Sequence, residues 1–212
     1  MAKKSKHSAN PLDKRRPVES REMYKRFLIV CEGEKTEPNY FLRYRELLRR
    51  LCEVEVVGTG YNTVSLVNEA MRLAGERKLD PDKDDEIWCV FDRDSFTKQE
   101  FNGAIELASN NKLFVAYSNQ AFELWYLLHF NYEDTAYSRQ TYQKRLSKLL
   151  GKKYEKNSTM MFFDLLEKQE DAIRNAYRLH DSHTAHLPPA DKDPSTTVHL
   201  LVESLNRNRK PR

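Results

Sequence analysis

The sequence lacks three features that would each define a class of protein. Its three cysteines, Cys31, Cys52 and Cys89, are odd in number and show no close ligand spacing. We therefore expect reduced, buried thiols in a cytoplasmic protein, because disulfide scaffolds need paired cysteines. No apolar stretch approaches the roughly 20 residues of a membrane span, and the first residues lack the apolar core of a signal peptide. No G-x-G-x-x-G follows the first apolar run, which disfavours dinucleotide binding.

Charge is distributed unevenly along the 212 residues. The net charge is +4, but residues 1–26 carry nine Lys or Arg against three acids, and residues 207–212 add four more basic residues. The residues in between therefore carry −6. We expect a basic disordered tail over 1–25, a second basic tail over 207–212, and a mildly acidic body. Such tails attract nucleic acid without sequence preference, although they also aid solubility, so both interpretations stay open.

Four short apolar runs predict strands at 26–31, 54–57, 86–91 and 113–117. Helical patterns separate them, near 38–51, 63–74 and 98–110, with Thr63 as the expected cap of the second helix. This alternation indicates an α/β fold with a Rossmann-like core, a four-stranded parallel sheet flanked by helices, over 26–120.

The second half of the chain predicts helices instead of strands. An apolar segment at 121–130 is typical of a buried helix, and a helix over 139–150 should end at Gly151. A longer helix is expected over 159–180 with Tyr177 on its buried face, then a loop over 181–195 and a last helix capped by Thr196 and Thr197. We expect this helical extension, 121–206, to pack on the core as one unit.

Acidic residues follow two of the predicted strands. Glu32-Gly33 comes after the first strand, and Asp92-Arg93-Asp94 comes after the third. In open α/β sheets chemistry gathers beyond the carboxyl ends of the strands, so neighbouring strands would bring Glu32, Asp92 and Asp94 together. Three carboxylates that lie so near one another need a cation to stay ionised. Oxygen ligands favour Mg²⁺, with Mn²⁺ as an alternative. The sequence thus predicts a divalent-metal phosphodiester enzyme.

The same motifs support a resemblance to a known family. The segments that carry it are Phe27–Val30 with Cys31-Glu32-Gly33-Glu34-Lys35-Thr36-Glu37-Pro38-Asn39-Tyr40-Phe41, Phe91–Asp94, Ser118–Phe130, Tyr154-Glu155-Lys156, and Pro194–Val198. The two acidic motifs on a four-stranded parallel core look like a TOPRIM domain, the metal-binding fold of topoisomerases, bacterial primases and overcoming-lysogenization-defect nucleases. The full set, spanning about 26–205, resembles the RloB-like family, which is akin to the AbiLii type of abortive-infection protein.

The resemblance implies roles for individual residues. Glu32, Asp92 and Asp94 would be the metal ligands, and Glu37 would hold a second metal or a metal-bound water. Relatives usually have Asn-Pro before Phe-Glu, whereas this chain has Asn119-Gln120-Ala121. That departure leaves Glu123 open between a site residue and an ordinary glutamate at a helix start. Among three nearby lysines, Lys156 is the best candidate to neutralise charge on a phosphate.

The resemblance also implies a biological role. It suggests a toxic nuclease of bacterial antiviral defence, acting on DNA or a structured RNA such as tRNA beside an ATPase encoded nearby, with a homodimer left open. The alternative is a nucleic-acid-binding or partner-docking subunit with a regulatory or inert TOPRIM site. His129, in the apolar helix, is expected to be a core histidine. His180, His183 and His186 lack the cysteine partners of a zinc site.

Overall fold

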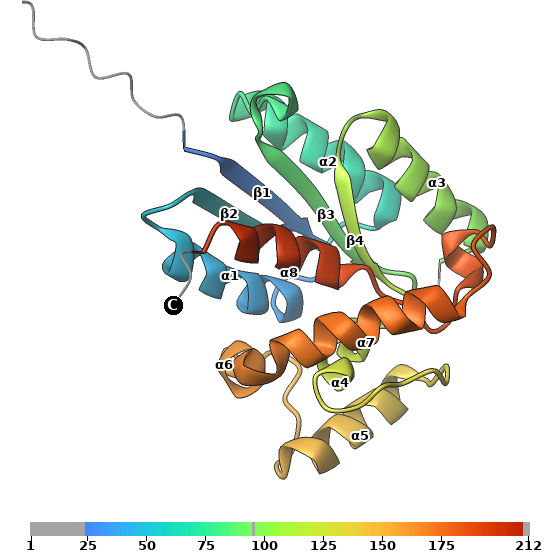
Figure 1. The fold of residues 1–212 in the computed structure, drawn as a ribbon. Helices are drawn as coiled ribbons and strands as arrows, with labels where there is room; N and C mark the ends of the chain where they lie inside the picture. Colours follow the sequence, from blue (N-terminus) through green and yellow to red (C-terminus); the bar gives the residue numbers. More distant parts are fainter. Residues whose placement is uncertain (1–23, 95, 210–212) are drawn as a thin grey trace, which may run out of the picture.

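The four apolar runs form one parallel sheet. The structure is a computed structural model that describes residues 24–94 and 96–209. Its strands are β1 (Arg26–Cys31), β2 (Glu53–Gly58), β3 (Glu86–Asp92) and β4 (Phe114–Ser118), in the spatial order β2-β1-β3-β4 (Figure 1). Every neighbouring pair is parallel. The predicted α/β fold with a Rossmann-like parallel core is therefore confirmed. Of the disordered tail predicted over 1–25, residues 1–23 lie outside the described residues, whereas Lys25 forms an ion pair with Glu86 at 2.7 Å.

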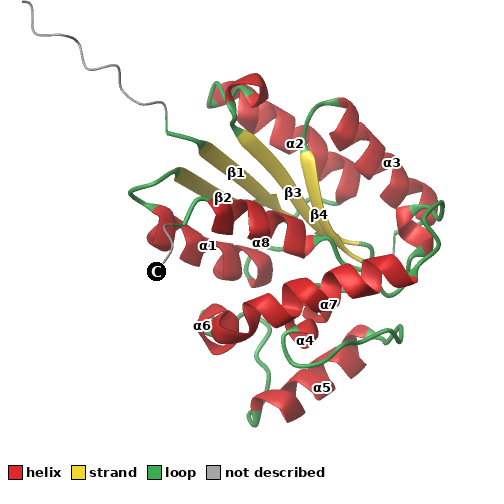
Figure 2. Cartoon of the chain, in the orientation of Figure 1, coloured by secondary structure: helices red, strands yellow, loops and turns green. Residues whose placement is uncertain are grey.

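Helices cover both faces of the sheet (Figure 2). Three of them connect the strands: α1 (Thr36–Leu48), α2 (Thr63–Glu76) and α3 (Lys98–Asn110). Successive β1 side chains point to opposite faces. Leu28 and Val30 pack in the core under α2 and α3, whereas Phe27 and Ile29 pack in the core that α1 and the later helices share. Both faces are thus buried, as a parallel sheet requires.

The second half of the chain is helical and packs on the α1 face, as expected. It comprises α4 (Glu123–Leu128), α5 (Arg139–Leu150), α6 (Met161–Leu165), α7 (Gln169–Ser182) and α8 (Val198–Arg207), with short 3₁₀ turns η1 (Pro81–Lys83), η2 (Leu166–Lys168) and η3 (Pro189–Asp191). Gly151 ends α5 in the left-handed conformation, at φ 66°. The helix predicted over 121–130 is shorter than expected at both ends.

The single long helix predicted over 159–180 was wrong. The chain forms α6, then η2, then α7, which continues to Ser182. Tertiary packing explains the break: Phe162 stacks edge-on against Tyr40 and Tyr44 of α1, and the side chain of Gln169 donates to both tyrosine hydroxyls. Tyr177 was also misplaced, because it is 41% exposed and bonds Glu203 on α8.

The expected side-chain caps at Thr63 and Thr197 do not form. Thr63 is the first residue of α2, after Asn62, and no side-chain cap forms there. Thr197 precedes α8 but its hydroxyl accepts the Tyr117 N–H at 2.9 Å. Its own N–H donates to the Tyr117 carbonyl, so the segment before α8 covers the open edge of β4.

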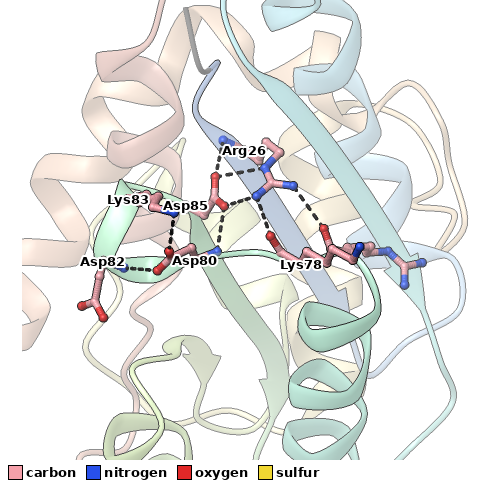
Figure 3. A network of polar contacts seen from close by, with 7 residues as sticks. Arg26, Lys78, Asp80, Asp82, Lys83 and Asp85 are labelled. Atoms are coloured by element: carbon pink, nitrogen blue, oxygen red, sulfur yellow. Dashed lines mark hydrogen bonds and ion pairs between the residues drawn. The ribbon is translucent and has the colours of Figure 1, made fainter.

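An ion-pair network joins the amino ends of β1 and β3 (Figure 3). The acidic motifs follow the carboxyl ends of the same strands, at the opposite end of the sheet. Arg26 donates to both oxygens of the buried Asp85 carboxylate and to the Lys78 carbonyl. Asp85 also accepts the Asp80 N–H at 2.8 Å. Each carboxylate oxygen of Asp85 therefore has a donor, which is the pattern of a structural ion pair.

Two further expectations concern cysteines and membranes. Cys31, Cys52 and Cys89 are free and buried, as predicted. Of the helices in the described residues, none combines the length and apolar character needed to cross a bilayer.

Candidate carboxylate site at the sheet edge

The site lies where the strand order reverses. β1 pairs with β2 on one side and β3 on the other, so the crevice beyond β1 and β3 is the topological switch point of the sheet. Glu32 directly follows β1, and Asp92 is the last residue of β3. The Asp92 N–H donates to Glu32 Oε2 at 3.1 Å. The two motifs predicted to meet are in contact.

The start of α4 fixes the Asp92 side chain. Asp92 is buried, and its Oδ2 accepts the Phe122 N–H at 3.0 Å. The next residue, Glu123, is 1% exposed and begins α4. Glu123 Oε1 accepts from Gln143 Nε2 at 3.1 Å and from the Tyr154 hydroxyl at 3.4 Å. The helical half of the chain thus encloses the crevice and adds a carboxylate to it.

Glu37 contributes a carboxylate that is not satisfied. The residue is 7% exposed, and its Oε2 has no hydrogen-bond partner among the described residues. A Cβ added at Gly33 would lie 2.1 Å from that oxygen, so only glycine lets the carboxylate lie against this turn. An unpaired buried carboxylate oxygen is energetically unfavourable and indicates that a ligand belongs there.

Asp94 lies at the rim with an unusual backbone. It is 42% exposed and has φ 40°, a left-handed conformation that is uncommon for residues other than glycine. Arg139 Nη1 lies 3.4 Å from Asp94 Oδ2, and its Nη2 lies 3.6 Å from Asp92 Oδ2. A single guanidinium, held by α5, therefore bridges the two aspartates.

Burial and mutual repulsion raise the pKa values of the enclosed carboxyls. Burial raises the pKa of Glu32 to about 7; Glu37 and Asp94 add to the shift, and the Asp92 N–H and Arg139 oppose it. Burial also raises the pKa of Asp92 well above its usual range, with contributions from Glu37, Glu123 and Glu32. The pKa of Glu37 rises for the same reasons, chiefly burial and then Glu123. The carboxyls act as one coupled cluster.

Of two other residues that the sequence singled out, Lys156 lies at the rim of the crevice and His129 lies in the core. Lys156 is exposed, and its carbonyl accepts the Thr36 hydroxyl at 2.9 Å. Its positive charge lowers the pKa of Glu37, so the ammonium group acts on the cluster from its rim. His129 is buried in the core with Nδ1 against the Trp125 carbonyl, and burial lowers its pKa to about 4. It is a core histidine, as expected.

Sequence reasoning missed Arg139, although a signal was present. Arg139 is the first residue of α5, where the helix dipole disfavours a positive charge. A nearby anion stabilises a cation in that position. It also missed Gln143 and Tyr154 as the donors that orient Glu123, because those contacts join segments 20 and 31 residues apart.

The donor set suits a hard cation. The crevice offers carboxylate oxygens, the ligands that Mg²⁺ and Mn²⁺ prefer, and one buried Glu37 oxygen with no partner in the described chain. Over 24–94 and 96–209, however, no group of three or more His, Cys, Asp or Glu side chains has the spacing of a metal-ligand cluster. Arg139 spans Asp92 and Asp94 in this arrangement. Holding a cation would therefore require these side chains to draw together.

Fold and site together define an α/β protein with an acidic crevice at the carboxyl edge of a doubly wound sheet. A family model described as RloB-like protein matches residues 27–205. The chain belongs to the RloB-like family. No curated protein matches the sequence.

Proposed function

We propose that the protein is a metal-dependent phosphodiesterase that cleaves nucleic acid. One observation carries the proposal: Glu32, Glu37, Asp92 and Glu123 share one crevice, in which burial and then the charges of neighbouring carboxylates raise the pKa values of Glu32, Glu37 and Asp92. A fold keeps such repulsion only where another charge relieves it, and perturbed carboxyls in a cleft are a mark of functional sites.

The carboxylates are the groups that would hold the metal ions. Glu32, Asp92 and Asp94 would hold one Mg²⁺, and Glu37 with Glu123 would help to hold a second. When bound, Mg²⁺ lowers the pKa of water and stabilises charge on a phosphate and its leaving oxygen.

The remaining residues orient the cluster or meet the substrate. Gln143 and Tyr154 hold Glu123 in position through their hydrogen bonds. Lys156, at the exposed rim, is placed to pair with a phosphate oxygen of the substrate. Arg139 reaches the same crevice from the start of α5 and offers a guanidinium that can also bind phosphate.

The test is a cleavage assay with matched variants. Plasmid DNA and total RNA are incubated with the protein in Mg²⁺, Mn²⁺ or EDTA, beside Asp92→Asn and Glu34→Gln. Glu34 is an exposed glutamate in the same loop as Glu32, so its variant controls for charge removal outside the crevice. We expect metal-dependent cleavage that Asp92→Asn abolishes and Glu34→Gln retains. Cleavage that persists in EDTA or in Asp92→Asn would refute the proposal.

The alternative function is a nucleic-acid-binding or partner-docking subunit with an inert site. The same experiment separates the two, because binding without cleavage, unchanged in Asp92→Asn, would favour the subunit.

The biological role is proposed from the family resemblance: toxicity in antiviral defence together with an ATPase partner. Expression in cells, with and without the neighbouring ATPase gene, tests it. Toxicity that requires Asp92 would support a nuclease effector, and equal growth with wild type and Asp92→Asn would count against it.

A further inference from the structure

Two adjoining hollows run along the outer side of α1. The first, of about 800 Å³, lies between the end of α1 and β2 and is lined by Tyr24, Arg45, Arg49, Arg50 and residues 52–56. The second, of about 520 Å³, includes Arg43, Arg45, Arg49 and Thr159. Arg45 and Arg49 line both hollows, and we name the two hollows together the arginine groove.

The acidic residues of the groove are largely engaged. Glu46 pairs with Arg43 at 3.2 Å, and Glu55 pairs with Arg77 at 2.6 Å. Glu53 is the remaining acid in the lining.

Three arginines of the groove have no carboxylate partner in the described part of the chain. Arg45, Arg49 and Arg50 are exposed and make no ion pair with any residue that the structure describes. Arg45 in the last turn of α1 and Arg49, the residue that follows the helix, are four residues apart, a spacing at which like charges repel. The helix dipole favours a cation in the last turn but does not account for a lined groove. The excess positive charge points to an anionic partner.

The second hollow begins near the carboxylate site, because Asn39 in its lining is two residues after Glu37. Glu37, in the first turn of α1, lies in the crevice, and Arg49 comes twelve residues later, about 18 Å away at 1.5 Å per residue. The loop after Lys156 follows the same helix, because Thr36 bonds the Lys156 carbonyl and Asn39 bonds the Asn157 carbonyl at 2.9 Å. Thr159, at the end of this loop, lines the second hollow. A chain bound in the groove would thus extend from the rim of the crevice.

An aromatic side chain stands at the far end. Tyr24 is 62% exposed and lines the first hollow beside the arginines. Proteins that hold single-stranded nucleic acid combine a positively charged groove with aromatic rings on which bases stack. Unstacked bases are free for such contacts, whereas those of a duplex are not.

We propose that the arginine groove binds the backbone of single-stranded nucleic acid, with Tyr24 stacking on a base, and so positions the strand whose phosphate enters the carboxylate site. The placement of the phosphate rests on the proposed function, but the binding surface does not. Single-stranded DNA and RNA share this backbone chemistry, so the test uses one oligonucleotide of each.

The test measures binding in EDTA, where cleavage cannot interfere. Fluorescence anisotropy follows labelled 12-nucleotide oligothymidylate and oligouridylate between 50 and 200 mM salt, with the full chain. We expect Arg45→Gln/Arg49→Gln/Arg50→Gln to weaken binding at least tenfold at low salt. The slope of log K against log salt should become shallower by about 2, because each phosphate contact on a single strand contributes about 0.7. Tyr24→Ala should weaken binding about tenfold with an unchanged slope.

A charge-matched control removes the same number of cations elsewhere. Arg72, Lys98 and Lys112 are exposed on the α2–α3 side, and their surface ion pairs contribute little to stability. The triple Gln variant of these residues should keep most of the affinity and slope, and thermal melting verifies that both triple variants fold. Equal losses of affinity in the two triple variants, or no binding of either oligonucleotide to the wild type, would refute the proposal that the groove binds single strands.

A small substrate separates this proposal from the proposed function. Hydrolysis of bis(p-nitrophenyl) phosphate in Mg²⁺ needs no groove, so the groove triple variant should hydrolyse it at the wild-type rate. If the wild-type protein binds oligonucleotide through the groove but hydrolyses neither substrate, the nuclease proposal is refuted and the binding proposal is supported. If it hydrolyses the small substrate but its oligonucleotide binding does not depend on the groove, the binding proposal is refuted and the nuclease proposal is supported.

Discussion

Replacing Glu32 by Gln should stabilise the metal-free protein at high pH. Burial and its acidic neighbours raise the pKa of Glu32 to about 7, above the ordinary value of 4.5. A carboxyl whose folded pKa is raised contributes stability that is present below pH 4.5 and lost as the pH rises through 7. Gln carries no charge at any pH, and its side-chain oxygen can still accept the Asp92 N–H.

The magnitude follows from the two pKa values. The difference between 4.5 and about 7 corresponds to about 3 kcal/mol in the free energy of unfolding, at 1.36 kcal/mol per pH unit. Glu32 is partly exposed, so solvent screening reduces this to about 2 kcal/mol. We expect Glu32→Gln to gain about that much at pH 8, and to differ from wild type by less than about 0.5 kcal/mol at pH 4.5, where Glu32 of the folded protein is neutral.

Urea unfolding in EDTA at pH 4.5 and pH 8 measures this gain, with Glu34→Gln as the matched control. Glu34 is exposed in the same loop, so its variant should stay within about 0.5 kcal/mol of wild type. Adding 10 mM Mg²⁺ at pH 8 should stabilise the wild type and leave Glu32→Gln nearly unchanged, because ligand binding to the folded state raises stability. A Glu32→Gln variant that is less stable than wild type at pH 8 in EDTA would refute the reasoning.

Three further predictions concern single residues. Arg139→Gln should lower the pH 8 stability of the protein in EDTA by about 1 kcal/mol but tighten Mg²⁺ binding in calorimetric titration, because a competing cation is removed; weaker Mg²⁺ binding would contradict it. Gly33→Ala should weaken Mg²⁺ binding at least tenfold, since its methyl group would displace the Glu37 carboxylate, and unchanged affinity would exclude Glu37 as a ligand. Asp85→Asn should lower the free energy of unfolding in urea by about 3 kcal/mol, because it removes the carboxylate partner of Arg26. It should leave the Mg²⁺ affinity unchanged, because this ion pair lies far from the crevice.

The sheet could be predicted from the sequence because its signals are local. Runs rich in β-branched and aromatic residues mark the strands, and the helical patterns between them leave few alternatives to a parallel sheet. The meeting of Glu32 with Asp92 followed from that topology alone. The break between α6 and α7 could not be predicted in this way. It depends on Phe162 and Gln169 meeting α1, and no helical periodicity records a contact more than 100 residues apart in the chain.

The two carboxylate arrangements at opposite edges of the sheet show what separates a structural cluster from a candidate site. At the amino edge, both oxygens of Asp85 have donors, so that pair is complete without any ligand. In the crevice, Glu37 has an unpaired buried oxygen, Asp94 has a left-handed backbone, and Arg139 opposes the dipole of its own helix. Natural sequences rarely violate local rules, and violations gather where function requires them. A left-handed backbone alone does not separate the two, because Lys78 of the paired network has φ 52°. The unpaired Glu37 oxygen and the arginine at a helix start have no counterpart among the described residues of that network, and they are the physical ground for placing the chemistry in the crevice.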